Sequence, residues 1–175
     1  AIVANIPGLT RDRQYGEGEF EDKTFIAIDT GGITGFEEGI DSKMASQSLL
    51  AVEEADICLL LVDAKDGVTP DDTQIVDYLR KNDKPSILIV NKVDGRDEDQ
   101  ALSEFYSLGM KELFPITATQ GRGVKKMLSA VLDRFVEPEE DVEGTAEQIG
   151  GTKIAVAGRP NVGKSTLVNR MLGED

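Results

Sequence analysis

Short apolar runs alternate with helix-like segments along most of the chain. The runs Ile57–Asp63 and Ser86–Asn91 are apolar almost throughout, as is typical of parallel strands that are covered on both faces of a sheet. An alternating stretch at Tyr15–Phe20 predicts one arm of a hairpin. The remaining strands are predicted at Thr24–Asp29, Leu113–Thr117 and Lys153–Ala157.

Helical signals fill the intervals between these strands. Thr69-Pro70 supplies an N-cap and a first-turn proline for a helix that reaches Lys81. Apolar residues recur at intervals of three and four over 124–135, which marks one face of a helix. Two further helices are predicted over 37–54 and 97–108. This alternation predicts an α/β fold with a doubly wound, mostly parallel sheet of six strands.

Three segments of the chain differ in composition. Residues 1–136 carry most of the predicted elements, and residues 153–175 open a new strand, loop and helix. Between them, residues 137–152 hold six acidic residues and no basic one, together with three glycines, which predicts a solvated linker. Because the chain begins at Ala1 inside a predicted loop and stops at Asp175 after a helical pattern, we expect it to be a piece of a longer protein.

Composition narrows the possible chemistry. The chain has 175 residues, a net charge of −14 and no histidine, which excludes histidine-based catalysis and histidine–zinc sites. The acidic balance argues against an extended nucleic-acid footprint or a membrane-binding surface on this chain. Its single cysteine, Cys58, lies in an apolar run, which indicates packing rather than a disulfide or a metal site. The expected compartment is the reducing cytoplasm.

The segment GRPNVGKS at 158–165 matches the phosphate-loop pattern GxxxxGK[ST] at every required position. A predicted strand precedes it and a helical segment follows, as such a loop requires. Lys164 is expected to reach the β- and γ-phosphates as a catalytic charge, and the Ser165 hydroxyl to bind Mg²⁺. The residues expected to contact GTP here are Gly158, Asn161, Val162, Gly163, Lys164, Ser165 and Thr166.

A candidate base-recognition motif, NKVD, follows the second apolar strand and contains Asn91, Lys92 and Asp94. It lies at the carboxyl end of that strand, where ligands bind in such sheets. A buried carboxylate that accepts hydrogen bonds from the ring N–H and the amino group of guanine would reject adenine. The pattern alone also fits an ordinary turn. Because a phosphate loop is present elsewhere in the chain, guanine recognition is the favoured interpretation.

Three weaker signals complete the set. Asp29 opens the segment DTGG at the end of a strand, where its carboxylate can hold Mg²⁺ through water and the N–H of Gly32 can meet a γ-phosphate. Thr10, in the segment PGLTRDR, is placed to close over Mg²⁺ and the γ-phosphate as part of a switch. Thr117 and Ala118 are candidates to contact guanine through their backbone N–H groups. The DTGG segment also fits a plain strand-to-loop turn without a ligand.

These motifs form the set of a guanine-nucleotide switch domain in a circularly permuted order, because the phosphate loop comes last. The segments GRPNVGKSTL, PGLTRDR, IDTGG, NKVDG and FYSLG resemble the bacterial EngA/Der GTPases over nearly the whole chain. That resemblance implies a cytoplasmic factor in large ribosomal subunit assembly, with two tandem G domains and a KH-like domain. Residues 1–136 resemble the first G domain from its switch I onward, and residues 153–175 the opening of the second. An Era-like or tRNA-modification GTPase is the runner-up resemblance.

The roles expected for two residues, Ile33 and Asn161, are implied by the resemblance alone. Ile33 stands where many small GTPases place a glutamine that orients water, and it resembles the hydrophobic substitution of this group. Asn161 matches the asparagine that helps bind K⁺ in related GTPases, where the cation supplies positive charge near the bond between the β- and γ-phosphates. Asn161 also fits a plain turn beside Pro160. The cofactors expected are therefore GTP or GDP and Mg²⁺, with K⁺ as an open addition.

The tail is expected to complete the sheet. This fold places the strand before the phosphate loop in the middle, so Lys153–Ala157 is expected between Thr24–Asp29 and Ile57–Val62. Ile154 and Val156 would face one side, with alanines on the other. The 16-residue linker has a coil reach of roughly 20–24 Å, which is enough for the return. If the strand Lys153–Ala157 of one chain instead completed the sheet of a second chain, the result would be a domain-swapped dimer. If the tail stayed free, residues 1–136 would be poorly folded.

Two functions of different classes remain open from the sequence. The first is an enzyme, a Mg²⁺-dependent GTPase that acts as a switch on the large ribosomal subunit through parts of the full-length protein. The second is an incomplete module that holds guanine nucleotide without catalysis. All five motifs favour the enzyme. The incomplete module is favoured by two features: the phosphate loop comes at the end of the chain, and the chain does not run continuously from that loop to Thr10.

Overall fold

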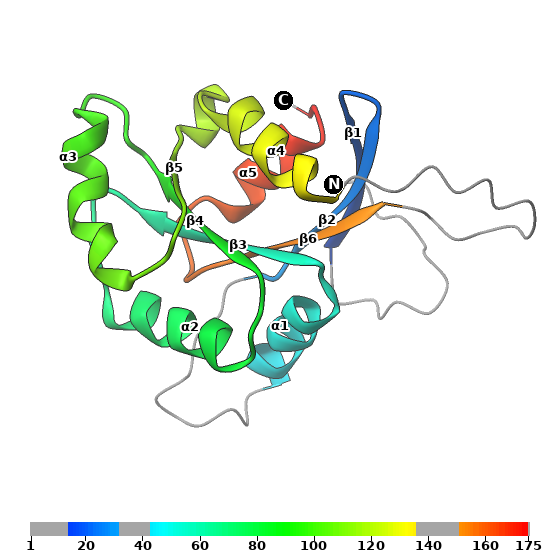
Figure 1. Ribbon diagram of the computed structural model, residues 1–175, viewed down its shortest axis with the longest axis horizontal. Helices are drawn as coiled ribbons and strands as arrows, with labels where there is room; N and C mark the ends of the chain where they lie inside the picture. The colour runs from blue at the N-terminus through cyan, green and yellow to red at the C-terminus, as the bar shows by residue number, and fades with distance from the viewer. Residues whose placement is uncertain (1–13, 32–42, 136–150, 175) are drawn as a thin grey trace, which may run out of the picture.

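A six-stranded, mostly parallel sheet forms the centre of the computed structural model, which describes residues 14–31, 43–135 and 151–174 (Figure 1). The strand order is β1-β2-β6-β3-β4-β5. Only β1 and β2 are antiparallel among these pairs, as the hairpin prediction required. The strands are β1 Gln14–Phe20, β2 Lys23–Asp29, β3 Ile57–Asp63, β4 Ser86–Asn91, β5 Leu113–Pro115 and β6 Thr152–Ala157.

Helices cover both faces of the sheet (Figure 1). One buried cluster joins the sheet to α1, α2 and α3, and the other joins its opposite face to α4 and α5. This arrangement confirms the doubly wound fold class. The helices are α1 Lys43–Glu54, α2 Pro70–Lys81, α3 Glu98–Ser103, α4 Val124–Leu132 and α5 Lys164–Met171, with short 3-10 turns at Glu104–Leu108, Ala118–Gln120 and Asp133–Phe135.

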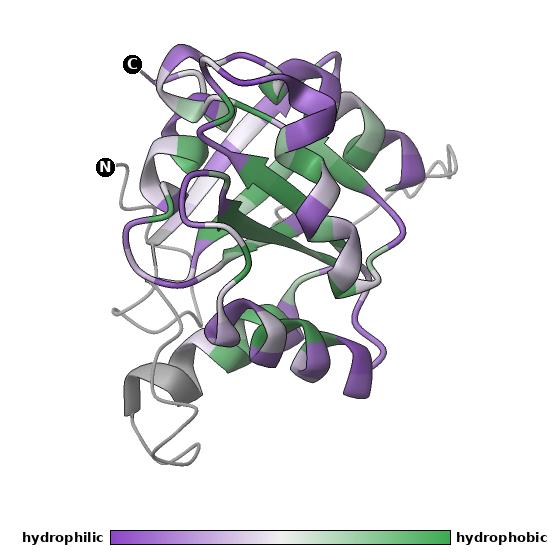
Figure 2. Ribbon diagram, turned by 90° about the vertical axis from the view of Figure 1, so that its left-hand side faces the viewer, coloured by the Kyte–Doolittle hydropathy of each residue, from purple (hydrophilic) through white to green (hydrophobic). Residues whose placement is uncertain are grey.

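The central strands are buried on both faces, which explains their continuous apolar sequence. Every residue of β3 is buried, and Figure 2 shows hydrophobic strands in the middle with hydrophilic residues on the outer helices. Cys58 lies in β3, and burial raises the pKa of its thiol to about 12, so the thiol stays protonated and unreactive. None of the described helices combines the length and apolar character needed to cross a bilayer.

Strand β6 occupies the predicted central position. It pairs in parallel with β2 on one side and with β3 on the other. Ile154 and Val156 point into the cluster beneath α4 and α5, whereas Ala155 and Ala157 face the cluster beneath α1 and α2. All four residues are fully buried. The prediction for this strand, including the faces of its side chains, is confirmed.

Polar contacts fix the two ends of β6. At its start, the Lys153 N–H donates to the Asp56 carboxylate at 2.7 Å. At its carboxyl end, the Thr30 hydroxyl donates to the Val156 carbonyl at 3.0 Å, and the Ser48 hydroxyl donates to the Thr30 carbonyl at 2.6 Å. The segment that carries the phosphate loop is thereby held at both ends of its strand.

Some predicted boundaries shift. The strand expected to reach Thr117 ends at Pro115, because Thr117 instead pairs with Arg122 across a tight turn. The helix predicted over 97–108 is a short α-helix that continues as a 3-10 helix, and the helix predicted over 37–54 is described from Lys43 onward. Helix α2 begins as predicted, with a capping box between Thr69 and Asp72. Most of the acidic linker and both chain ends lie outside the described residues.

Candidate functional site

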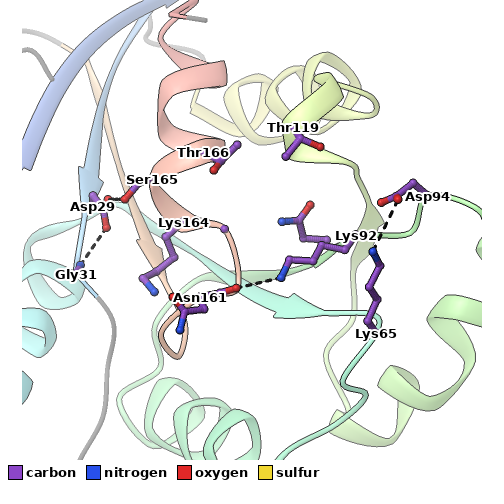
Figure 3. Close-up of a pocket in the computed structure, with 12 residues that line it drawn as sticks. Asp29, Gly31, Lys65, Lys92, Asp94, Thr119, Asn161, Lys164, Ser165 and Thr166 are labelled. Atoms are coloured by element: carbon purple, nitrogen blue, oxygen red, sulfur yellow. Dashed lines mark hydrogen bonds and ion pairs between the residues drawn. The ribbon is translucent and has the colours of Figure 1, made fainter.

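A cleft of about 530 Å³ opens at the carboxyl edge of the parallel strands (Figure 3). Its walls come from the end of β2, the loops after β3, β4 and β5, and the loop between β6 and α5. Segments far apart in the chain therefore share one site. The lining residues are Asp29, Gly31, Lys65, Asn91, Lys92, Asp94, Thr119, Asn161, Gly163, Lys164, Ser165 and Thr166.

The phosphate loop needs glycine at two points. Gly158 has φ +152°, and a Cβ there would lie 2.5 Å from the Leu61 carbonyl oxygen. Gly163 has φ +105°, and a Cβ there would lie 2.5 Å from the Asn91 side-chain nitrogen. Both glycines are thus required by left-handed backbone and by close neighbours. Val162 is fully buried beneath the loop, so Gly158 and Val162 shape the loop from behind.

Lys164 opens helix α5 and is only 6% exposed. Its ammonium donates to the Arg159 carbonyl at 2.8 Å, across the arch of the loop. Burial lowers the pKa of this ammonium, and the charge of Asp29 opposes the shift. A partly desolvated cation beside a helix N-terminus is suited to hold phosphate oxygens. Figure 3 shows Lys164 between Ser165 and Asn161, facing the cleft.

Asp29 and Ser165 meet as the Mg²⁺ prediction required. The Ser165 hydroxyl donates to Asp29 Oδ2 at 2.7 Å, and Asp29 Oδ1 accepts from the Gly31 N–H at 3.0 Å (Figure 3). Among the described residues no cluster of three acidic, histidine or cysteine side chains could hold a metal by itself. A hydroxyl and one carboxylate fit Mg²⁺ that takes its other ligands from water and phosphate oxygens. These two residues therefore fit the ion.

Asn91 makes contacts within the protein that the motif did not predict, and its expected contact with GTP stays a prediction. Its amide nitrogen donates to the Val162 carbonyl at 2.8 Å, and its amide oxygen accepts from the Ala118 N–H at 3.0 Å. The side chain is buried and ties the phosphate loop to the turn after β5. Although Asn91 borders the cleft, these bonds use its oxygen and one N–H on the protein itself.

The turn after β5 contains Thr117 and Ala118, whose expected contacts with guanine stay predictions. Thr117 and Ala118 are buried, and their N–H groups donate to the Arg122 carbonyl and to Asn91 respectively. Thr119, the next residue of this turn, lines the cleft. Arg170 of α5 supports this turn by donating to the carbonyls of Ala118 and Thr119. Buried backbone groups need internal partners, which the motif pattern alone does not reveal.

Lys92 and Asp94 form the opposite wall from the phosphate loop (Figure 3). The Lys92 ammonium lies 2.6 Å from Asp63 Oδ2 and donates to the Asn161 carbonyl at 3.1 Å, so it joins this wall to the loop. Asp94 remains 42% exposed, with the Lys65 ammonium 3.9 Å away. Sequence reasoning missed Lys65, Asp63 and Thr119; the position of Lys65 just past the end of β3 was the available signal.

The predicted switch residues are not all placed. Thr10, Gly32 and Ile33 lie outside the described residues, so their expected roles stay predictions. Asn161 borders the cleft with a left-handed φ of +65°. This backbone fits the plain-turn interpretation and leaves its side chain at the site.

A mostly parallel sheet with a phosphate loop between a central strand and a helix, at the same edge as the NKVD loop, is typical of P-loop nucleotide-binding proteins. The chain belongs to the family of 50S ribosome-binding GTPases, whose sequence profile matches residues 1–92 and 153–175. Residues 153–175 contain the phosphate loop, and residues 1–92 contain Asp29 and the strands β1 to β4.

The curated relatives confirm the resemblance drawn from the motifs. GTPase Der of Cellvibrio japonicus is 57% identical over 176 residues, which cover all of this chain and 37% of that protein. GTPase Der of Marinobacter nauticus is 57% identical over 175 residues with the same coverage. The chain thus spans less than two fifths of the length of these relatives. Their names favour the Der resemblance over the runner-up.

Solved structures support the fold. A variant of Era from Aquifex aeolicus, bound to GDP·AlF4−, has a TM-score of 0.62 at 24% identity, covering 82% of this chain and 51% of that one. The cytosolic domain of FeoB from L. pneumophila has a TM-score of 0.52 at 19% identity, covering 84% of this chain and 59% of that one. Both show that the described sheet and helices form a GTPase-type fold.

Proposed function

We propose that this chain binds GTP and GDP with Mg²⁺ in the cleft and hydrolyses GTP as a switch. One observation carries the proposal: the phosphate loop and the NKVD loop meet at one sheet edge, joined by the Asn91 side chain. The family membership supports a nucleotide of the guanine class.

The base is proposed to lie against Asp94. This carboxylate borders the cleft and keeps enough exposure to accept two hydrogen bonds from guanine. Lys65 lies beside it and would keep positive charge near the carboxylate without occupying it at hydrogen-bond distance. Adenine has no donor pair to match this acceptor, so the site would discriminate against ATP.

The phosphates are proposed to lie against Gly163, Lys164, Ser165 and Thr166. Lys164 would leave the Arg159 carbonyl and neutralise the β- and γ-phosphates, with the α5 N-terminus behind it. Mg²⁺, held by Ser165 and Asp29, would supply charge that balances the phosphates. The expected contributions of Thr10 and Gly32 to the γ-phosphate remain part of this proposal.

Hydrolysis by this chain is proposed to be slow and faster in K⁺. No arginine points into the cleft among its lining residues in the described part of the chain. An added cation near Asn161 would replace the missing positive charge. The place of Asn161 within the phosphate loop and on the wall of the cleft supports this role.

We also propose that residues 1–136 form the domain body, that 137–152 form the linker and that 153–175 complete the site. The burial of β6 within one chain supports completion in cis. Exchange of this segment between two chains would use the same pairings and give a swapped dimer. In the full-length protein, we place the switch in the cytoplasm and on the large ribosomal subunit, with neither a nucleic-acid footprint nor a membrane contact on this part of the chain.

A titration with fluorescent GDP, followed by competition with unlabelled GTP and ATP, tests this function. We expect tight competition by GTP and none by ATP at equal concentration. Lys164→Ala should abolish measurable GDP binding, because a buried ammonium that faces two phosphates is removed. The matched control is Lys126→Ala on the exposed face of α4, which should bind as the wild type does.

Each outcome of this titration is informative. Equal competition by ATP and GTP would refute the role of Asp94. Unchanged affinity in Lys164→Ala would refute binding at the phosphate loop. Phosphate release from GTP, measured with and without K⁺ in matched buffers, then separates the GTPase from the incomplete binding module.

A further inference from the structure

The second residue of the phosphate loop, Arg159, directs its side chain away from the cleft. Its guanidinium lies 2.5 Å from Asp66 Oδ2, in the loop after β3. Arg159 Nε also lies 3.8 Å from Asp72 Oδ1 at the start of α2. The phosphate loop is thus linked through this side chain to Asp66 and Asp72, neither of which lines the cleft.

Asp72 is an unusual helix-cap residue because its side chain is completely buried. Its Oδ2 atom accepts from the Thr69 N–H at 3.0 Å and serves the capping box. Its other oxygen, Oδ1, has no hydrogen-bond partner among the residues that the structure describes, and neither does Arg159 Nε. Two buried polar atoms of opposite charge therefore face each other, slightly beyond hydrogen-bond distance.

A cap alone does not require this burial. Capping residues usually lie at the surface, where water satisfies the second oxygen. A buried carboxylate is costly unless a cation neutralises it, and Arg159 is the cation at hand. Burial raises the pKa of Asp72, while the hydrogen bonds from Thr69 and the charge of Arg159 oppose that rise. The arrangement therefore favours a role for Asp72 toward the loop.

The backbone of Arg159 faces the other way. Its carbonyl oxygen accepts from the Lys164 ammonium at 2.8 Å. One residue thus has its side chain anchored beside α2 and its main chain in contact with the lysine that faces the cleft. Asp66 is half-exposed and hydrogen-bonds Arg159, so water screens this pairing, whereas Asp72 faces Arg159 from a fully buried position where its charge is little screened.

We propose that Asp72 is a positioning residue that acts through Arg159 to order the phosphate loop for the di- or triphosphate group of a nucleotide. The effect on nucleotide rests on the proposed function, whereas the ordering of the loop does not. With the Arg159 side chain fixed, the arch from Gly158 to Gly163 keeps its backbone N–H groups turned toward the cleft, and less order is lost when phosphate binds.

Asp72→Asn tests this role with little change in shape. An asparagine keeps an oxygen for the Thr69 N–H but removes the charge that faces Arg159. The matched control is Thr69→Ala, which removes the other half of the capping box and leaves the carboxylate in place. Urea unfolding of both variants calibrates their loss of stability, so that general weakening of α2 can be separated from an effect on the loop.

Two readouts are needed. The first is amide hydrogen exchange of residues 158–165 in the nucleotide-free chain. We expect this exchange to be about tenfold faster in Asp72→Asn than in the control, because the loss of one charge-assisted interaction makes opening of the loop more favourable by about that factor. The second is GDP affinity, expected to fall on the order of tenfold in Asp72→Asn and to change little in Thr69→Ala. Arg159→Lys combined with Asp72→Asn should be no worse than the single variants.

The outcomes separate the two proposals. If exchange of 158–165 is equal in Asp72→Asn and Thr69→Ala at matched stability, the positioning role is wrong, whatever the GDP result. Additive effects of the Arg159 and Asp72 substitutions on exchange would also contradict it. If the wild type binds no GDP, the proposed function fails, and faster exchange in Asp72→Asn alone would still support the ordering of the loop.

Discussion

Replacing Ile154 by alanine tests whether the tail is part of the folded sheet in solution. Ile154 lies in the middle of β6 and pairs with Ala27 of β2 on one side and Ile57 of β3 on the other. Its side chain is fully buried beneath α4 and α5. The substitution removes buried atoms and keeps the backbone hydrogen bonds of the strand.

The expected loss of stability follows from that burial. Truncation of a buried isoleucine to alanine costs about 2–5 kcal/mol, because apolar contacts are lost and a cavity remains. The sheet neighbours of Ile154 are held by two ladders and cannot easily collapse into the space, which places the cost near the upper part of that range. A domain has a net stability of roughly 5–15 kcal/mol, so the loss should be easy to measure.

Urea unfolding followed by circular dichroism provides the assay. We expect Ile154→Ala to lower the midpoint without a large change in the slope of the transition. The control is Lys153→Ala in the neighbouring position, whose side chain is exposed and should contribute within about 0.5 kcal/mol.

The opposite result would refute the reasoning. If Ile154→Ala changes the free energy of unfolding by no more than Lys153→Ala does, β6 is not packed in the sheet in solution. The nucleotide cleft would then lack its phosphate half. A concentration-dependent midpoint would instead indicate that the strand comes from a second chain.

Four further predictions concern the site. Asp94→Asn should shift preference from GDP toward xanthosine diphosphate, whose additional oxo group suits an amide donor; unchanged guanine preference in competition titrations would contradict this. Gly163→Ala should lower thermal stability and GDP affinity more than Gly95→Ala. Both glycines have a left-handed backbone, but only a Cβ at position 163 would meet a neighbour within 4 Å. Equal losses would show that the contact between Asn91 and the phosphate loop is unimportant. GTP hydrolysis should be faster in KCl than in NaCl, and equal rates would remove the role of Asn161. Burial lowers the pKa of Lys164, and bound phosphates would raise it, so GDP binding should take up protons as the pH rises toward the usual lysine pKa of about 10.4. The affinity for GDP should fall in the same pH range. Calorimetry in buffers of different ionisation enthalpy measures this uptake and would reveal none if Lys164 does not meet phosphate.

The sequence predicted the sheet well because its signals were local. The apolar runs of β3 and β4 and the cap of α2 each define their element from neighbouring residues. The place of β6 was also predictable, since a strand before a phosphate loop is central in this fold. The least accurate boundary was β5, where Thr117 turns back to pair with Arg122.

The motifs predicted which residues gather at the cleft, but not the contacts that these residues make with one another. Lys164, Ser165 and Asp29 lie together as the motifs indicated. Asn91, however, uses its side chain to join two loops, and Ala118 donates to it. Such partners come from segments distant in the chain, so no spacing along the sequence could reveal them.

The link from Arg159 to Asp72 shows the same limit. Each residue fits a local pattern, one a phosphate loop and the other a capping box. Their proximity depends on how β3, β6 and α2 pack, with 86 residues of sequence between the two positions. Only the folded chain shows that two unpartnered buried atoms face each other.

A crystal structure of this chain with GDP and Mg²⁺ tests the central claim most directly. We predict one nucleotide per chain, with its phosphates against Gly163–Ser165, its guanine against Asp94 and both halves of the site supplied by the same chain. A nucleotide bound with its phosphates on one chain and its base on another would contradict completion in cis. Phosphates bound away from Lys164, or no nucleotide in the cleft at saturating GDP, would contradict the site itself.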